Sequence, residues 1–208
     1  MFHTETRKYG PVEVHLLYFE NFEMEEHYHN LMGAEYERLK TLSHPARKRE
    51  YVATRVLRTM VFGNENILYN DVGAPFIEGE GFISISHAPH VVGLAFCKQF
   101  QVGLDLEPIR EKALIVKDKF LSSDESRLLK TNSALEMTKV WSGKEALYKL
   151  AGRKGIIFSE NLHLIKRKEE EWEGKIQFVD RVKFVPMHIV KVNDFILSVN
   201  SNRVYEQG

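Results

Sequence analysis

The chain has 208 residues, of which 43% are hydrophobic and 28% charged, and its 29 basic residues balance its 29 acidic ones. A domain that binds duplex nucleic acid is usually strongly basic, so this balance argues against a nucleic-acid partner. No apolar run approaches the roughly 20 residues that cross a bilayer, and the single cysteine excludes an internal disulfide. We therefore expect a cytoplasmic protein with neither a membrane nor a nucleic-acid partner.

The first part of the chain predicts one strand followed by two helices. Residues 12–19 have a strand pattern, and residues 23–40 form a charged and loosely helical segment. Residues 43–63 predict a firmer helix, with Ser43 as its N-cap and Gly63 just past its end.

Short β-like runs occupy the middle of the chain. Brief turns separate them, so we expect hairpins. The runs cover residues 81–87, 91–97 and 101–107.

The character of the sequence changes after Pro108. Residues 122–130 open with serines and acids and predict a short helix. The strongest helix signal is at 133–152, where Ser133 and Glu136 have the spacing of a capping box and Gly152 supplies a stop. Three further β-rich runs follow, at residues 162–168, 175–185 and 194–200.

The order along the chain is a strand, helices and hairpins, followed by helices and hairpins again. It predicts an α+β protein of two similar halves, with the boundary near residues 105–115. We place the N-terminal half at 1–107 and the C-terminal half at 108–208. Because no proline- or glycine-rich linker separates them, we expect the halves to pack tightly.

Two carboxylates stand out in the run VGLDLEPIR, residues 102–110. Residues two apart on a strand point to one face, so Asp105 and Glu107 share a face. Protonation, a cationic side chain or a metal would relieve their repulsion. An exposed strand face with solvated acids is the alternative.

A helical stripe adds a third carboxylate. Trp141, Glu145 and Lys149 are spaced i, i+4 and i+8 and therefore lie on one side of the helix 133–152. An ordinary Glu–Lys pair with a packing tryptophan is the simpler interpretation. If Glu145 joins the two strand carboxylates, the three hard oxygen donors suit Mg²⁺ or Mn²⁺ together with a phosphate-bearing substrate.

Groups able to bind phosphate lie upstream. Arg49 and Arg55 lie on the helix predicted at 43–63, and Ser86 and His87 end the run 81–87. Both of these last side chains can donate hydrogen bonds to an anion. A solvated basic face and a structural histidine are the alternatives. Histidine pairs elsewhere lack the further ligands that zinc requires.

Three segments in order resemble one family. VGLDLEPIR is similar to its G-x-D-x-E motif, WSGKEALYKLAG to its W-x-x-K-E-A-x-x-K motif, and FISISHA to its S-H segment. These are signatures of the larger, monomeric type of 4′-phosphopantetheinyl transferase, which activates synthetase and acyl carrier domains. The resemblance covers residues 45–160 and includes the arginine-rich segment RKREYVATRVLR. It departs from the family at VGAPF, where Ala74 replaces the lysine of G-K-P.

The resemblance implies both a fold and a site. The fold would be a monomer of two α/β halves related by a pseudo-twofold axis, each a small antiparallel sheet with a long helix. The implied ligands of Mg²⁺ are Asp105, Glu107 and Glu145. The implied ligands of coenzyme A are Arg49, Arg55, Ser86, His87, Lys144 and Lys149, with Arg55 the weaker candidate. Ala74 would remove one cation near the nucleotide.

The implied reaction transfers 4′-phosphopantetheine from coenzyme A to a serine hydroxyl of an apo acyl or peptidyl carrier protein and releases 3′,5′-ADP. Lys149 would neutralise pyrophosphate charge, and Glu145 would take the serine proton, although metal ligation would weaken it as a base. Residues 109–122 mix cations with apolar side chains and are expected to dock the carrier, unless they are an ordinary amphipathic connection. A Mg²⁺-dependent nucleotide phosphohydrolase and a non-catalytic binder of coenzyme A or a carrier remain alternatives.

Overall fold

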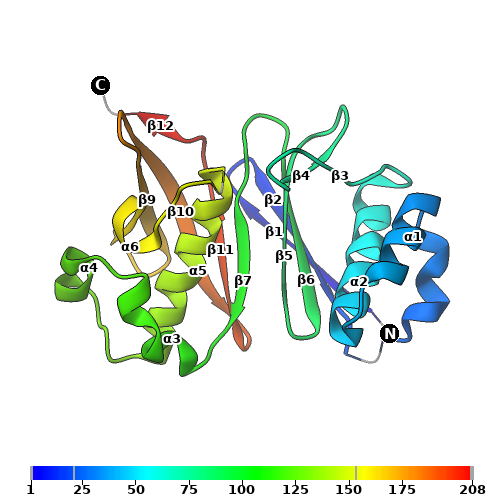
Figure 1. Ribbon diagram of the computed structural model, residues 1–208, viewed down its shortest axis with the longest axis horizontal. Helices are drawn as coiled ribbons and strands as arrows, with labels where there is room; N and C mark the ends of the chain where they lie inside the picture. Colours follow the sequence, from blue (N-terminus) through cyan, green and yellow to red (C-terminus); the bar gives the residue numbers. More distant parts are fainter. Residues whose placement is uncertain (1, 21, 153, 207–208) are drawn as a thin grey trace.

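The computed structural model describes residues 2–20, 22–152 and 154–206. Two antiparallel sheets form its centre, and one long helix covers each of them (Figure 1). Helix α2 (Pro45–Phe62) lies on the first sheet and α5 (Ala134–Leu150) on the second. The expected α+β fold of two similar halves is confirmed.

The first sheet has the strand order β1-β2-β6-β5-β4-β3. Its strands are β1 (His3–Tyr9), β2 (Val12–Tyr18), β3 (Leu68–Tyr69), β4 (Pro75–Ile77), β5 (Gly81–Ala88) and β6 (Val91–Cys97). Strand β1 was not predicted, because its sequence HTETRKY is polar and lacks the apolar alternation of a half-buried strand. It pairs along the whole of β2 at the edge of the sheet.

The second sheet has the strand order β7-β11-β10-β9-β8, with β12 also paired to β10. Its strands are β7 (Leu104–Pro108), β8 (Leu162–Lys166), β9 (Glu171–Gln177), β10 (Val182–Val192), β11 (Phe195–Asn200) and β12 (Tyr205–Glu206). The short helices beside it are α3 (Lys112–Ile115), η2 (Lys117–Lys119), α4 (Ser123–Leu128) and α6 (Phe158–Asn161).

The two sheets repeat one arrangement. The order β2-β6-β5-β4 in the first sheet corresponds to β7-β11-β10-β9 in the second. In each half the long helix follows the first strand of this series and precedes the other three along the chain. This repeated topology confirms the pseudo-twofold relation between the halves.

The helix boundaries differ from expectation in the first half. The segment 23–40 is not one helix but a 3₁₀ helix, η1 (Met24–Asn30), followed by α1 (Gly33–Thr41). The N-cap of α2 is His44 rather than Ser43, because Pro45 opens the helix and keeps the preceding residue extended. Gly63, with φ +67°, ends α2 as predicted.

Ser133 caps α5 as expected, with one of the two hydrogen bonds of a capping box. Ser133 Oγ accepts a hydrogen bond from the backbone N–H of Glu136 at 3.3 Å. Gly152 has φ +83° just after α5, in the left-handed region that favours glycine. Helix α4 begins with a complete capping box made by Ser122 and Glu125.

One of the two expected hairpins is wrong. Strands β5 and β6 form the predicted hairpin, but β7 leaves the first sheet and pairs with β11. Near the start of β7, the backbone N–H of Gly103 donates to the buried Asn200 side chain at 2.9 Å. Strand β7, which the division at residue 107 placed in the N-terminal half, therefore belongs to the second sheet.

A shared apolar core joins the halves. Val14 from the first sheet and Leu104, Leu106 and Val190 from the second are buried in one cluster. Helix α5 lies close to the residue before β7 because Gly103 has no side chain, and a Cβ there would overlap the carbonyl oxygen of Ala146. In the part of the chain that the structure describes, no helix is long and apolar enough to span a membrane.

Candidate active site at the junction of the sheets

The candidate site lies where β5 of the first sheet meets β7 of the second, near the centre of the molecule (Figure 1). Side chains bridge these strands, since β7 forms its backbone ladder with β11. The hydroxyl of Ser84 accepts the backbone N–H of Leu104, and that of Ser86 accepts the N–H of Leu106, both at 3.0 Å. These bonds hold the carboxylate-bearing strand at the junction.

Asp105 is the most buried carboxylate of the site, with 6% of its surface exposed. Its Oδ1 atom accepts the Ser86 hydroxyl at 3.1 Å and the Lys149 ammonium at 3.3 Å. Its Oδ2 atom is buried and has no hydrogen-bond partner among the residues that the structure describes. A buried anionic oxygen without a partner is costly, so this atom marks a place where a cation would be stabilised.

Lys149 connects the long helix to both strands. Besides Asp105, its Nζ atom donates to the carbonyl oxygens of Leu104 at 2.5 Å and Ile85 at 3.4 Å. These contacts occupy the three hydrogens of the ammonium group. The lysine thus places positive charge between α5, β7 and β5, beside Asp105.

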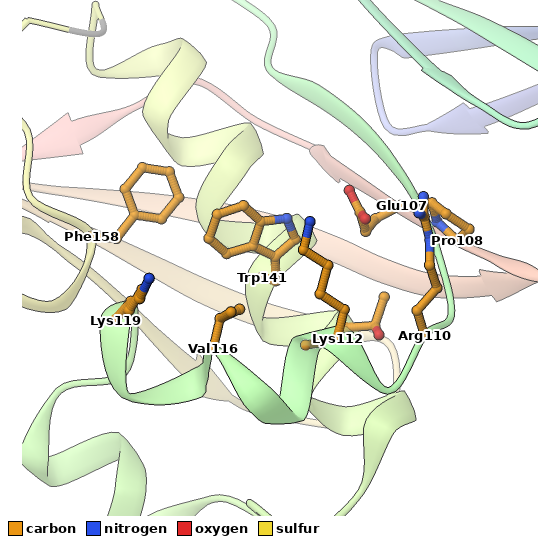
Figure 2. A pocket seen from close by; sticks show the side chains of 10 residues that line it. Glu107, Pro108, Arg110, Lys112, Val116, Lys119, Trp141 and Phe158 are labelled. Atoms are coloured by element: carbon orange, nitrogen blue, oxygen red, sulfur yellow. The ribbon is translucent and has the colours of Figure 1, made fainter.

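Glu107 is half-buried and lies at the edge of a cavity of about 570 Å³ (Figure 2). Burial raises the pKa of its carboxyl above the ordinary value, and the negative charge of Asp105 raises it further. Arg110, a hydrogen bond from Trp141, and Lys112 oppose this rise in pKa. The site therefore holds two carboxylates whose repulsion is only partly compensated.

The cavity beside Glu107 has apolar walls and a basic rim. Figure 2 shows Glu107 on one side of the Trp141 ring and Phe158 on the other. The two rings are stacked, with centroids 5.3 Å apart. The residues that line the cavity are Glu107, Pro108, Arg110, Lys112, Ala113, Val116, Lys119, Thr138, Trp141 and Phe158.

The predicted stripe of α5 lies along β7. Trp141 hydrogen-bonds to Glu107 at one end of the stripe, and Lys149 bonds to Asp105 at the other. The half-buried Glu145 is on the helical turn between these two contacts. The fold therefore places α5 beside the strand that carries Asp105 and Glu107.

The donor chemistry of the three carboxylates suits a hard divalent cation such as Mg²⁺. The unpartnered Oδ2 of Asp105 and the only partly compensated charge at Glu107 are consistent with such a cation. Within the described residues, however, no three Asp, Glu, His or Cys side chains are grouped as a metal site. The residues fit a divalent cation by chemistry and charge, while the structure does not show the three carboxylates gathered around one point.

Lys144 requires a correction. Its side chain is fully buried, and Nζ donates to Glu125 Oε2 at 2.7 Å and to the carbonyl oxygens of Phe120 and Phe158. Burial lowers the pKa of Lys144, and the Glu125 carboxylate opposes that effect. Lys144 lies one helical position from the Glu145 stripe and turns into the interior, where it offers no exposed surface to a ligand.

Arg55 is also engaged inside the protein. Its Nε atom donates to Glu35 Oε1 at 3.1 Å, and its guanidinium lies over the Tyr51 ring, 3.6 Å from the centroid. The neighbouring Arg58 is fully buried and shares Glu35. One edge of Arg55 still lines a second cavity of about 360 Å³ between α2 and β5.

This second cavity contains His87 but not Arg49. His87 is exposed, with Nε2 3.1 Å from Glu50 Oε2. Arg49 instead lines a separate acidic hollow with Glu20, Glu23 and Glu25. Besides Arg55, the structure places Arg47 with His87, and the sequence interpretation missed Arg47. Arg47, Tyr51 and Arg55 are spaced i, i+4 and i+8, and this spacing could have identified the face of α2 that lines the cavity.

Two further predicted positions are located. Ser86 is buried, and its hydroxyl bonds to β7 rather than opening into the cavity of His87. Ala74 lines a smaller cavity of about 220 Å³ together with Lys149. The substituted G-K-P position is thus next to the lysine of the α5 stripe.

Comparison with protein families identifies the part of the chain that carries this site. Residues 101–199 match the model of the 4′-phosphopantetheinyl transferase superfamily. No curated protein matches the chain. The matched segment includes Asp105, Glu107, Glu145 and Lys149, whereas the residues around His87 lie outside it.

Proposed function

We propose that the protein transfers 4′-phosphopantetheine from coenzyme A to a serine hydroxyl of an apo acyl or peptidyl carrier protein, with release of 3′,5′-ADP. The observation that carries this proposal is the junction itself, where Asp105 and Glu107 lie beside Lys149 within the matched segment. The resemblance of the S-H and arginine-rich segments extends the proposal to the first half.

A divalent cation, Mg²⁺ or alternatively Mn²⁺, would be held by Asp105, Glu107 and Glu145. When bound it would stabilise negative charge on the transferring phosphoryl group. Lys149 adds positive charge on the same side of the site, and its three contacts fix its position before substrate binds. Such preorganised charge is the main contribution a protein makes to phosphoryl transfer.

The cavity that contains His87 and the cavity beside Glu107 suggest how coenzyme A would lie. The nucleotide would occupy the cavity lined by Arg47, Tyr69 and His87, with its phosphates toward the junction. Glu107, on the other side of the junction, opens to the apolar cavity of Trp141 and Phe158. The carrier serine would approach from this second side, opposite the departing nucleotide, because the displacement requires an in-line arrangement.

Glu145 is the proposed acceptor of the serine proton. It is half-buried on the face of α5 that lies along β7. A carboxylate in hydrogen-bond reach of a hydroxyl can act as a general base, and that task competes with metal ligation. Glu145→Gln is expected to slow transfer while leaving carrier binding intact.

The carrier would dock on the segment 109–122. This segment forms α3 and η2, where Ile115 is 81% exposed and Arg110, Lys112 and Lys119 surround the cavity beside Glu107. An apolar centre with a basic rim complements an acidic helical surface. The protein would act as a monomer in the cytoplasm, as the family resemblance and the single cysteine imply.

Intact-protein mass spectrometry of an apo carrier protein incubated with the protein, coenzyme A and Mg²⁺ tests the proposal. The expected result is a gain of one phosphopantetheine on the carrier. Asp105→Asn should reduce the rate by at least about 100-fold, because it removes a charge from the site. The matched control is Asp180→Asn, at an exposed position between β9 and β10, which should transfer at the normal rate.

Two outcomes would contradict the proposal. Failure to modify several carriers despite binding of coenzyme A would favour a non-catalytic binder. Cleavage of coenzyme A with the carrier unmodified would favour a nucleotide phosphohydrolase.

A further inference from the structure

The junction between the sheets depends on two serines at matching positions. Strand β7 pairs with β11 along one edge only, so the N–H groups on its other edge need partners from elsewhere. Ser84 and Ser86 are two residues apart on β5, like Leu104 and Leu106 on β7. Each serine accepts one of these N–H groups at 3.0 Å.

The two serines differ in what their hydroxyl protons do. A hydroxyl that accepts an N–H can still donate its own proton. Ser86 donates to Asp105 Oδ1 at 3.1 Å, whereas the described contacts of Ser84 include no bond to a carboxylate of the site. Ser84 is therefore a natural control, since it makes the same backbone bond without touching Asp105.

The bond from Ser86 determines which oxygen of Asp105 is available. Oδ1 is held by Ser86 and Lys149 together, while Oδ2 is buried without a partner among the described residues. Ser86 itself is buried, and its hydroxyl is committed to Leu106 and Asp105. This geometry differs from that of a ligand for the nucleotide phosphates, the role that the motif resemblance implies.

We propose that Ser86 is a positioning residue that fixes the Asp105 carboxylate and so presents Oδ2 to the divalent cation. The catalytic role of Ser86 rests on the proposed function. The predicted effect of Ser86 on cation binding does not depend on that function. Groups that orient a metal ligand through one hydrogen bond typically change metal affinity by about 10- to 100-fold.

A titration with Mn²⁺ tests the inference. Coenzyme A is present and the carrier is omitted, and the electron paramagnetic resonance signal of free Mn²⁺ measures how much of the ion is bound. Ser86→Ala should weaken Mn²⁺ binding by about 10-fold or more. Ser86→Thr, which keeps the hydroxyl, should restore most of the affinity. The KM for coenzyme A at saturating metal should remain within about twofold of the wild-type value, since the serine does not bind the nucleotide.

Ser84→Ala supplies the comparison for loss of a junction bond. It should leave Mn²⁺ affinity within about twofold of wild type, because the Asp105 bond is untouched. Equal weakening by Ser84→Ala and Ser86→Ala would overturn the inference in favour of a general effect of the junction. An unchanged Mn²⁺ affinity in Ser86→Ala, with a raised KM for coenzyme A, would overturn it in favour of a phosphate ligand.

The experiment distinguishes a variant that fails to fold from a folded variant with weaker metal binding. Circular dichroism is recorded for each variant first. If Ser86→Ala does not fold, Ser86→Cys replaces it, since a thiol is a weak donor and acceptor of nearly the same size. Serine-dependent Mn²⁺ binding in a protein that fails to modify any carrier would refute the proposed function and leave the positioning role intact.

Discussion

Lys144 and Lys149 lie five residues apart on α5 and have different surroundings. Lys149 reaches the strands of the candidate site, whereas Lys144 is sealed inside with Glu125. Removing one partner of a buried ion pair leaves the other charge without compensation. Lys144 is therefore assigned to stability rather than to substrate binding.

Lys144→Met should lower the free energy of unfolding by about 3 kcal/mol, measured by urea denaturation. The control is Lys40→Met, because Lys40 pairs with Glu37 on the surface and such pairs contribute less than about 1 kcal/mol. An equal loss in the two variants would contradict the structural role of Lys144.

His15 on β2 makes stability depend on pH. Burial lowers the pKa of its imidazole below the ordinary value, although Glu13 opposes the shift. Protons therefore bind the unfolded chain more readily than the folded one. The stabilising contribution is present above the unfolded pKa of about 6.5 and is lost as the pH falls below it.

Chemical denaturation at pH 7.5 and pH 5.5 measures this effect. His15→Gln should lose less stability between the two pH values than the wild-type protein does. His44→Gln, at an exposed position before α2, should show the wild-type pH dependence. A wild-type pH dependence in His15→Gln as well would contradict the assignment to His15.

At the scale of elements, the close approach of α5 to the residues around β7 depends on Gly103. A side chain there would collide with the Ala146 carbonyl and displace the helix that carries Glu145 and Lys149. Gly103→Ala should lower stability by about 2 kcal/mol, as overpacking does, and should also slow phosphopantetheine transfer.

Thermal unfolding and the carrier modification rate test this prediction together. Gly33→Ala at the start of α1 is the control, because open space surrounds that position and alanine favours a helix. That variant should be at least as stable as the wild-type protein. A Gly103→Ala protein with normal stability and rate would show that α5 tolerates the displacement.

The elements with strong local signals could be predicted from sequence. Helix α5 has a capping serine and a terminal glycine, and β6 is an apolar run bounded by turns. Strand β1 could not be found, because its polar edge position needs no apolar pattern. The partner of β7 is β11, about ninety residues away, and local sequence does not encode such pairing.

Within the site, too, some residues could be predicted from local sequence and others depend on the tertiary structure. Asp105, Glu107 and Lys149 could be proposed from the sequence because each lies on one regular element whose period fixes its direction. For Lys144 the family motif suggested substrate binding, whereas the structure buries its side chain beside Glu125. The hydroxyl partners of Ser86 depend on how the two sheets meet, which only the tertiary structure shows.

For the whole molecule, the shared core implies one cooperative unfolding transition. The buried cluster around Val14 and Leu104 includes strands of both sheets, so neither half can lose it alone. Both tryptophans, Trp141 and Trp172, lie in the second half. Fluorescence therefore reports on that half, while far-ultraviolet circular dichroism reports on the entire chain.

The two signals should give the same urea midpoint. Val14→Ala, in the first half, should lower both midpoints together through a loss of about 2 kcal/mol. Val179→Ala, at an exposed turn, should change neither midpoint. Separate midpoints in Val14→Ala would show that the halves unfold independently.

The edge strand β1 has a consequence for stoichiometry. In the repeated topology β2 corresponds to β7, and a symmetrical molecule would open a second junction beside β2. Strand β1 covers that edge along its full length, from His3 opposite Tyr18 to Tyr9 opposite Val12. Of the two corresponding strands, β7 therefore has the open junction and β2 does not, and each molecule is expected to bind a single equivalent of coenzyme A.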